Sequence, residues 1–146
     1  MVCLGNICRS PMAEGVLKNK AQERGIEIYI DSAGTTNWHE GELPDGRAME
    51  EMRNRGVDIS GQRSRPFNTK DFDQFNHILA MDLSNKTDVL DMSRGEEDTA
   101  KVSLILDYGN EIKGMNVPDP YYNDAFDHVY ELLDFACDAF LDSIEK

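Results

Sequence analysis

The stretch Cys3-Leu4-Gly5-Asn6-Ile7-Cys8-Arg9-Ser10-Pro11 decides the fold of this chain. It has the form of a cysteine, five residues, an arginine and a serine, followed by apolar residues at helical spacing. Backbone N–H groups that curl above a helix N-terminus form a cradle for anions, and the positive end of the helix dipole strengthens it. Gly5 and Asn6 tolerate the positive φ angles that such a turn needs. The stretch therefore predicts an anion-binding loop that leads into a helix.

Two side chains of this loop suit phosphate chemistry. Arg9 offers a planar, permanently charged fork that can grip two phosphate oxygens. Cys3 stands at the base of the predicted cradle, where a helix N-terminus and a nearby cation favour the nucleophilic thiolate, to which the Ser10 hydroxyl can donate. A lone Cys-x5-Arg also occurs by chance, so the Gly-Asn turn and the Ser-Pro helix start give the pattern its weight.

In the sequence that follows the loop, short apolar runs alternate with helical patterns. A first helix is predicted from Ser10 and Pro11 to a stop at Gly25, followed by a strand over Ile26–Ile30. Further strands are expected at 77–81 and 102–106, and further helices at 45–55, 70–75, 84–91 and between Asp127 and Ile144. Strands separated by helices imply a parallel sheet with helices on both faces. Ligands of such folds bind beyond the carboxyl ends of the strands, where the loop would lie.

Length and composition predict one globular domain over residues 1–146. The chain is 40% hydrophobic and 29% charged, and its net charge is −13. Residues 1–70 hold ten acids and ten bases, whereas residues 71–146 hold eighteen acids and five bases. A charge this negative argues against nucleic acid as a partner.

The cysteines and the chain start indicate the compartment. Three irregularly spaced cysteines are typical of cytosolic thiols rather than of a secreted disulfide framework. The first residues have neither a basic nor an apolar leader region, and no apolar run approaches the ~20 residues that a membrane span needs. We expect a cytoplasmic protein that does not engage membranes and is a monomer or a weak dimer.

A second motif, Val117-Pro118-Asp119-Pro120-Tyr121-Tyr122, precedes the last helix. The two prolines hold the Asp119 carboxyl in a narrow range of positions, as a proton donor to a leaving group requires. By itself the Asp-Pro pair would indicate only a turn and a helix entry.

Taken together, these motifs resemble the low-molecular-weight protein tyrosine phosphatases. The likeness covers nearly the whole chain and includes residues 3–15, Asp31-Ser32-Ala33-Gly34-Thr35, Ala80-Met81-Asp82 and residues 117–122. It implies a three-layer α/β/α fold with a four-stranded parallel sheet, as in phosphotyrosine protein phosphatase I. The implied activity is hydrolysis of phosphotyrosine in proteins through a cysteinyl-phosphate.

The resemblance also assigns roles to individual residues. It implies Cys3 as the nucleophile, Arg9 as the phosphate clamp and Asp119 as the general acid and then the general base. The implied phosphate-binding residues are Leu4, Gly5, Asn6, Ile7, Cys8, Arg9 and Ser10, with Asn6, Ser10 and Ser32 in supporting roles. No cofactor is needed, and the wide spacing of His39, His77 and His128 makes a metal site improbable.

Aromatic residues are candidates for the wall that stacks on the substrate ring. The family places aromatics at points that match Trp38, Tyr121 and Tyr122, although Trp38 could instead be an exposed loop aromatic or a partial core residue. Relatives that remove phosphate from arginine carry Thr at the place of Ile7, so Ile7 favours tyrosine specificity.

Four features leave alternatives open. Cys8 could form a reversible disulfide with Cys3 or be a packed thiol, whereas Cys137 is expected to be a core thiol. Only Met1 and Val2 precede Cys3, so the first strand of the sheet is expected to be truncated: either the native start lies upstream, or other residues substitute for the missing ones, or the sheet tolerates a short strand with lost stability. Many relatives have a His near Gln62 that supports the loop, and Gln62 could replace its hydrogen bond but not its charge.

Two other functions compete with the phosphatase. An arsenate reductase uses the same fold and a similar loop, but its chemistry needs further cysteines, and the stretch directly after Met81 has none. A non-catalytic module that binds phosphate or phosphopeptides is possible if the short first strand misplaces Cys3.

Overall fold

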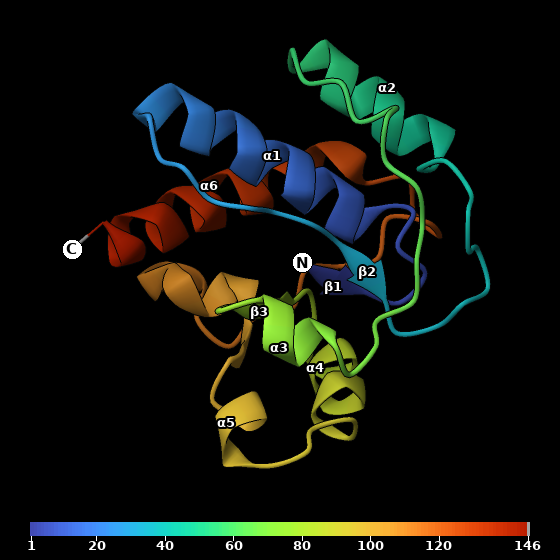
Figure 1. The fold of residues 1–146 in the computed structure, drawn as a ribbon. Helices are drawn as coiled ribbons and strands as arrows, with labels where there is room; N and C mark the ends of the chain where they lie inside the picture. Colours follow the sequence, from blue (N-terminus) through green and yellow to red (C-terminus); the bar gives the residue numbers. More distant parts are fainter. Residues whose placement is uncertain (146) are drawn as a thin grey trace.

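The structure, a computed structural model that describes residues 1–145, is built on a parallel sheet of four short strands (Figure 1). They are β1 (Val2–Cys3), β2 (Ala33–Gly34), β3 (Ile78–Ala80) and β4 (Val102–Leu104). The order across the sheet is β2-β1-β3-β4. Val2 is in register with Ala33 on one side and with Ala80 on the other. The nucleophile candidate Cys3 is therefore the last residue of an inner strand.

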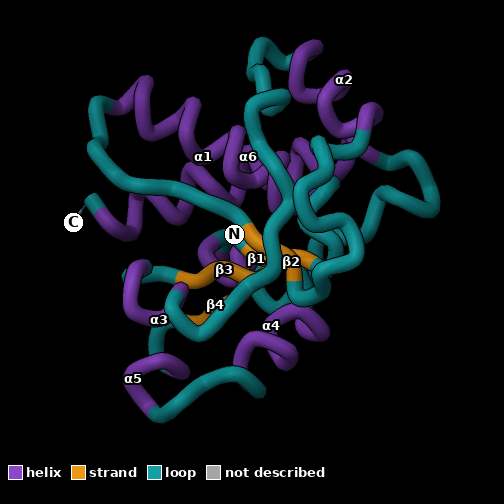
Figure 2. Tube along the Cα trace, turned by 45° about the vertical axis from the view of Figure 1, so that its right-hand side comes forward, coloured by secondary structure: helices purple, strands orange, loops and turns teal. Residues whose placement is uncertain are grey.

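Helices cover both faces of this sheet, which confirms the predicted three-layer fold. Figures 1 and 2 place α1 (Arg9–Arg24), α2 (Gly46–Asn54) and α6 (Phe126–Ile144) on one side. On the other side lie α3 (Asp71–Gln74), α4 (Leu83–Leu90) and α5 (Glu96–Thr99). Two 3-10 turns, η1 (Ile105–Tyr108) and η2 (Asn110–Ile112), follow β4.

Each face of the sheet has its own apolar core. Because successive strand residues point to opposite faces, Cys3 packs into the cluster under α1 and α6, whereas Val2 packs into the one with Phe72 and Val89. The larger cluster also holds Met12 and Leu133. The cysteine loop is thus anchored to the main core of the molecule.

The predicted strand over Ile26–Ile30 is wrong. These residues form a loop, and the strand of this region is β2, Ala33–Gly34. The β-branched residues suggested a strand, but a strand also needs a neighbour to pair with. In the observed register β1 begins at Val2 opposite Ala33, so the backbone of 26–30 lies beyond the start of its partner.

The predicted start of the first helix is also corrected. Helix α1 begins at Arg9 with Cys8 as its N-cap, and Ser10 lies inside the first turn instead of capping it. Pro11 is tolerated there because the first N–H groups of a helix have no intrahelical acceptor. The predicted stop is confirmed, since Gly25 takes the left-handed conformation with φ +69°.

Other bounds follow the sequence more closely. Helix α2 lies within the predicted 45–55, and the Asp45 carboxylate caps it by accepting the Arg47 N–H. Strand β4 ends at Leu104, where the predicted apolar run 102–106 continues as η1. β1 is short, as expected. Within residues 1–145 no helix has both the length and the apolar character needed to cross a bilayer.

Candidate active site

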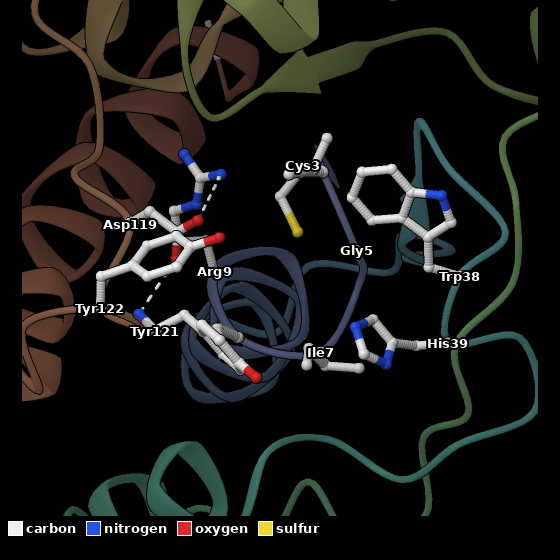
Figure 3. A pocket seen from close by; sticks show the side chains of 11 residues that line it. Cys3, Gly5, Ile7, Arg9, Trp38, His39, Asp119, Tyr121 and Tyr122 are labelled. Atoms are coloured by element: carbon white, nitrogen blue, oxygen red, sulfur yellow. Dashed lines mark hydrogen bonds and ion pairs between the residues drawn. The ribbon is translucent and has the colours of Figure 1, made fainter.

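A cleft of about 180 Å³ opens at the carboxyl ends of β1 and β2 (Figure 3). Three segments far apart in the sequence form it: the loop between β1 and α1, the loop after β2, and the segment before α6. The lining residues are Cys3, Leu4, Gly5, Ile7, Cys8, Arg9, Trp38, His39, Asp119, Tyr121 and Tyr122. The predicted residues Asn6, Ser10 and Ser32 lie behind this lining: Asn6 and Ser10 form hydrogen bonds with Cys3, and Ser32 accepts one from Asn6.

The Cys3 thiol stands at the base of the cleft. Its Sγ accepts the Asn6 backbone N–H at 3.2 Å and lies 3.0 Å from the Ser10 Oγ. Both groups can donate a hydrogen bond to the sulfur. The loop thus surrounds the sulfur with donors.

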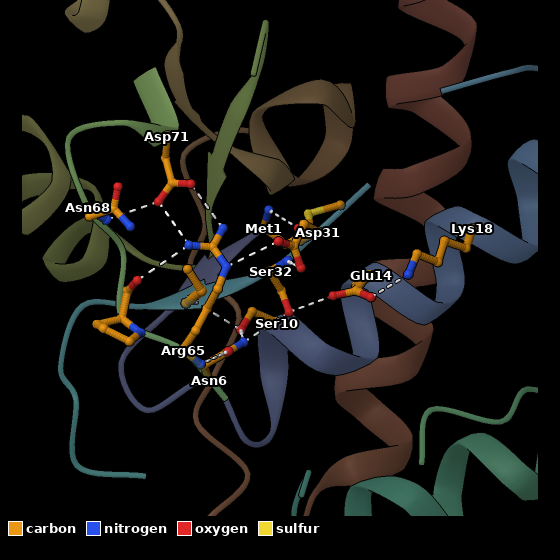
Figure 4. A network of polar contacts seen from close by, with 12 residues as sticks. Met1, Asn6, Ser10, Glu14, Lys18, Asp31, Ser32, Arg65, Asn68 and Asp71 are labelled. Carbon is orange, nitrogen blue, oxygen red and sulfur yellow. Dashed lines mark hydrogen bonds and ion pairs between the residues drawn. The ribbon is translucent and has the colours of Figure 1, made fainter. Parts of the chain in front are cut away.

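Asn6 organises the loop from behind (Figure 4). Its φ of +56° makes the turn, and its amide oxygen accepts the Arg65 backbone N–H at 3.0 Å. Since a backbone N–H can only donate, the Asn6 NH₂ must face the two serines, Ser10 at 2.7 Å and Ser32 at 3.0 Å. Ser10 Oγ therefore accepts from Asn6, and its own proton can go to Cys3 Sγ at 3.0 Å or to the Ala33 carbonyl at 3.5 Å, of which the sulfur is the nearer acceptor.

Glu14 extends this network into the helix and was not predicted from the sequence. It is 3% exposed; Ser32 Oγ donates to its Oε1 at 2.7 Å, and Lys18 Nζ donates to Oε2 at 2.6 Å (Figure 4). Because the Ser32 proton points to Glu14, the Ser32 oxygen is free to accept from Asn6. Glu14 thereby fixes the direction of the hydrogen bonds that end at Cys3.

Gly34 at the end of β2 allows the loop to approach the sheet. A Cβ there would lie 2.9 Å from the Leu4 carbonyl oxygen and 3.2 Å from the Asn6 backbone nitrogen. A backbone atom cannot move aside as a side-chain tip can, so a larger residue would push the loop away.

Arg9 is buried and is held on two sides. Its guanidinium donates to Asp82 Oδ2 at 2.6 Å and to the Val117 carbonyl at 3.0 Å, and it lies 3.7 Å from Asp119 Oδ2. Burial opposes the charged form, but the negative groups around it, the Cys3 sulfur first, raise the pKa of Arg9 above its usual value. The fork is thus a fixed cation beside the cleft.

Asp82 was quoted within a motif but given no role by the sequence. Besides binding Arg9, it caps α4 by accepting the Asn85 N–H at 2.7 Å. Its position directly after the buried strand β3 is the signal that could have identified it, since the ends of parallel strands meet at one edge of a sheet.

Asp119 lies on the opposite side of the cleft from Trp38 (Figure 3). Its side chain is about 30% exposed, and its Oδ1 accepts the Tyr121 N–H at 3.1 Å. The other oxygen faces Arg9. The carboxyl thus stands between a buried cation and open solvent, where it can exchange a proton with a substrate or with water.

The three predicted wall aromatics all line this cleft. Trp38 is 69% and Tyr122 82% exposed, and the rings of Tyr121 and Tyr122 meet edge to face at 5.1 Å between centroids. Trp38 is therefore an exposed aromatic of the cleft and not part of the core. His39, considered from the sequence only as a metal ligand, also lines the cleft and contacts Glu42 through Nδ1 at 2.8 Å.

Cys8 and Cys137, the other two cysteines, are buried. All three cysteines are free. Burial raises the pKa of Cys8, and it raises that of Cys137, which packs in the core as predicted, to about 12. A neutral packed thiol at Cys8 agrees with these surroundings, while a disulfide with Cys3 stays a prediction.

Gln62 contacts the helix rather than the loop. Its Nε2 donates to the Pro11 carbonyl at 3.0 Å in the first turn of α1, so its support of the loop is indirect. Among residues 1–145 no group of three or more His, Cys, Asp or Glu side chains is placed to hold a metal ion.

Comparison with known proteins agrees with this geometry. The family model described as "Low molecular weight phosphotyrosine protein phosphatase" matches residues 1–146. The chain is 40% identical to the low molecular weight protein-tyrosine-phosphatase YfkJ of Bacillus subtilis, with 99% of this chain and 94% of that protein covered.

Solved structures show the same likeness. A protein tyrosine phosphatase from Entamoeba histolytica, crystallised with Hepes in its active site, superposes with a TM-score of 0.93 at 38% identity, covering 99% of this chain and 94% of that one. The Drosophila arginine phosphatase superposes with a TM-score of 0.91 at 32% identity, covering 99% and 96%. The overall fold is therefore shared with a protein named a tyrosine phosphatase and with one named an arginine phosphatase.

Proposed function

The chain belongs to the low molecular weight phosphotyrosine protein phosphatase family, and we propose that its cleft hydrolyses phosphotyrosine and aryl phosphates through Cys3, Arg9 and Asp119. The observation that supports these roles is the meeting of the three side chains in one cleft: Cys3 at its base, and Arg9 3.7 Å from Asp119. The chain is accordingly a hydrolase of phosphoric monoesters.

The first step transfers the phosphoryl group to sulfur. Cys3 Sγ attacks phosphorus as the bond to the aryl oxygen breaks, and protonated Asp119 gives its proton to that oxygen. Arg9 and the N–H groups of residues 4–10 bind the phosphoryl oxygens, whose charge peaks in the transition state. The products are a phenol and a cysteinyl-phosphate.

The second step releases phosphate. Asp119, now a carboxylate, takes a proton from a water molecule whose oxygen attacks phosphorus, and the S–P bond breaks to restore the Cys3 thiolate. The chemistry needs only side chains of the chain itself. Ser10 Oγ, 3.0 Å from Cys3 Sγ, can donate its proton to the sulfur as it leaves phosphorus.

The choice between phosphotyrosine and phosphoarginine rests on Ile7. Its side chain lines the cleft (Figure 3). Relatives that act on phosphoarginine carry Thr at the position of Ile7. A branched apolar side chain narrows the entrance, and the exposed aromatics Trp38 and Tyr122 favour a flat ring. We assign tyrosine as the substrate residue on this ground.

The rival functions have less support. An arsenate reductase would relay a disulfide between accessible thiols, but Cys137 is fully buried in the core. A binding module without turnover would not need the donors that surround the Cys3 sulfur.

We extend the proposal to the organisation and setting of the protein. Residues 1–146 form one phosphatase domain in the cytoplasm, which acts as a monomer or weak dimer on tyrosine-phosphorylated proteins and engages neither nucleic acid nor membranes. The net charge of −13 favours phosphotyrosine sites flanked by basic residues.

The test compares wild type, Cys3→Ser and Asp119→Asn. Wild type should release phosphate from p-nitrophenyl phosphate and from a phosphotyrosine peptide, but not from phosphoarginine. Cys3→Ser should lose on the order of 10⁴-fold or more in kcat. Asp119→Asn should lose about 10²–10⁴-fold. Unchanged turnover in Cys3→Ser, or peptide binding by wild type without turnover, would refute the assignment.

A further inference from the structure

The segment that carries Asp119 has few contacts of its own. At its start, the Val117 N–H donates to the Met81 carbonyl at 2.8 Å, and the Val117 carbonyl accepts from Arg9. At its end, Asp124 takes a positive φ of +58°. Between these points Pro120 is buried and its carbonyl accepts the Asp124 N–H at 2.9 Å, whereas Tyr121 and Tyr122 are exposed, so the position of Asp119 also depends on contacts from other elements.

Arg47 of α2 holds the middle and the end of this segment. Its NH1 donates to the Tyr121 carbonyl at 3.2 Å and pairs with the Asp124 carboxylate. The guanidinium also lies over the Tyr121 ring, 5.4 Å from its centroid, and over the Phe126 ring at 5.0 Å. Arg47 therefore contacts both the backbone and the ring of the residue that lies two positions after Asp119.

The other side of Arg47 is tied to the phosphate-binding loop. Its Nε and NH2 donate to the two oxygens of Asp45, each at 3.1 Å, in a paired fork. The Asp45 backbone N–H in turn donates to the Ile7 carbonyl at 2.7 Å. Hydrogen bonds thus run from the loop of the nucleophile through Asp45 and Arg47 to the segment of the acid.

The two carboxylates beside Arg47 stabilise its positive charge. Hydrogen bonds with Asp45 and then Asp124 raise the pKa of Arg47, so the guanidinium stays charged at every working pH. Arg47 is not among the residues that line the cleft. Its effect on the reaction must therefore pass through the position of another group.

We propose that Arg47 is a positioning residue that sets the reach of Asp119 to the leaving oxygen of the substrate. The inference rests on the proposed function, because it needs Asp119 to be the proton donor. A displacement of a catalytic group by about 1 Å can lower a rate about 10²-fold. Release of Tyr121 and Asp124 would allow Asp119 such a displacement and leave Cys3 and Arg9 in place.

The way in which the loss of kcat/KM depends on the leaving group distinguishes a positioning role from a general loss of structure. Phenolate is a poor leaving group that needs protonation, whereas 2,4-dinitrophenolate leaves without it. In Arg47→Met we expect kcat/KM to fall about 30- to 100-fold for phenyl phosphate and less than about threefold for 2,4-dinitrophenyl phosphate. The ratio kcat/KM is used because it reports the step in which the aryl oxygen leaves.

Three further variants complete the test. Arg47→Lys, which can replace only part of the fork, should give an intermediate loss. Arg53→Met, a matched change of an exposed arginine on the same helix, should leave both substrates unaffected. The double variant Arg47→Met with Asp119→Asn should lose no more than Asp119→Asn alone, because Arg47 acts through that carboxyl.

The proposal would be overturned if Arg47→Met lowered kcat/KM equally for both substrates. It would also be overturned if the double variant lost more kcat/KM than Asp119→Asn alone. Unfolding in urea checks that Arg47→Met is folded, and Arg47→Lys supplies the comparison if it is not. If Asp119→Asn itself shows no dependence on the leaving group, the role of Asp119 in the proposed function fails. If Asp119→Asn shows the dependence and the Arg47 variants do not, only the positioning role fails.

Discussion

The two halves of the cleft are built in opposite ways. The loop of Cys3 is part of the core: Asn6 and Ser10 are 2% and 0% exposed and are fully engaged in hydrogen bonds. The segment of Asp119 lies on the surface, with Tyr122 82% exposed, and depends on contacts from other elements.

This difference separates two tasks of the site. Binding and attack at phosphorus need donors fixed before the substrate arrives, which a buried loop provides. Proton transfer needs a carboxyl that meets both the leaving group and water, which a buried group could not do. We expect changes in the loop of Cys3 to lower stability and activity together, and changes in the segment of Asp119 to alter activity alone.

Among the changes that test how the two halves are joined, the largest effect should come from Arg9, which contacts both. Arg9→Lys keeps the charge but loses the fork that binds Asp82 and the Val117 carbonyl. We expect kcat/KM for p-nitrophenyl phosphate to fall about 10²–10³-fold and the free energy of unfolding in urea to fall by about 1–3 kcal/mol. Arg63→Lys, at an exposed position, is the control. A loss of activity with unchanged unfolding would show that Arg9 does not join the two halves.

A smaller effect on activity and a clear effect on stability should follow from Asn6. Asn6→Ala removes three hydrogen bonds and places Ala at φ +56°, so we expect the free energy of unfolding to fall by about 2–4 kcal/mol. Asn6→Gly removes the same hydrogen bonds but accepts the φ angle, and it should recover about 1 kcal/mol. The difference between the two variants in urea unfolding measures the backbone contribution; equal stabilities would mean that the turn is not strained.

The smallest effect should come from the exposed half. Tyr122→Ala removes an aromatic ring from the wall of the cleft. Within the described residues this ring pairs only with that of Tyr121. We expect KM for a phosphotyrosine peptide to rise about fivefold. The urea midpoint should not change, because an 82% exposed side chain adds little to folding. A lowered midpoint would contradict the separation of the two halves.

Much of the loop of Cys3 could be predicted from the sequence because its residues are neighbours in the chain. The residues from Cys3 to Pro11 contain the proposed nucleophile, the turn, the proposed phosphate clamp and the first residues of α1 in one run. Glycine, asparagine and proline each restrict or extend the backbone in ways that a single sequence reveals. The layers followed from the alternation of strands and helices, whereas the order of the strands across the sheet was not predicted.

The residues that were missed act over long separations. Asp82 lies 73 positions from Arg9, and Arg47 lies 74 from Tyr121, so their partners emerge only after folding. Glu14 appeared as one more acid on a helix until its neighbours Ser32 and Lys18 were seen. The strand over 26–30 failed for a related reason: local β propensity does not supply a partner strand.

Burial of the loop of Cys3 couples ligand binding to unfolding of the whole chain. The loop joins β1 to α1, so it cannot open while the main core stays intact. An oxyanion that occupies the cradle binds the native state and not the unfolded one, and at 100 times its Kd it adds about 2.7 kcal/mol to the free energy of unfolding. The melting temperature in rising concentrations of inorganic phosphate thus becomes a direct measure of occupancy of this site, even in a variant that no longer turns over substrate.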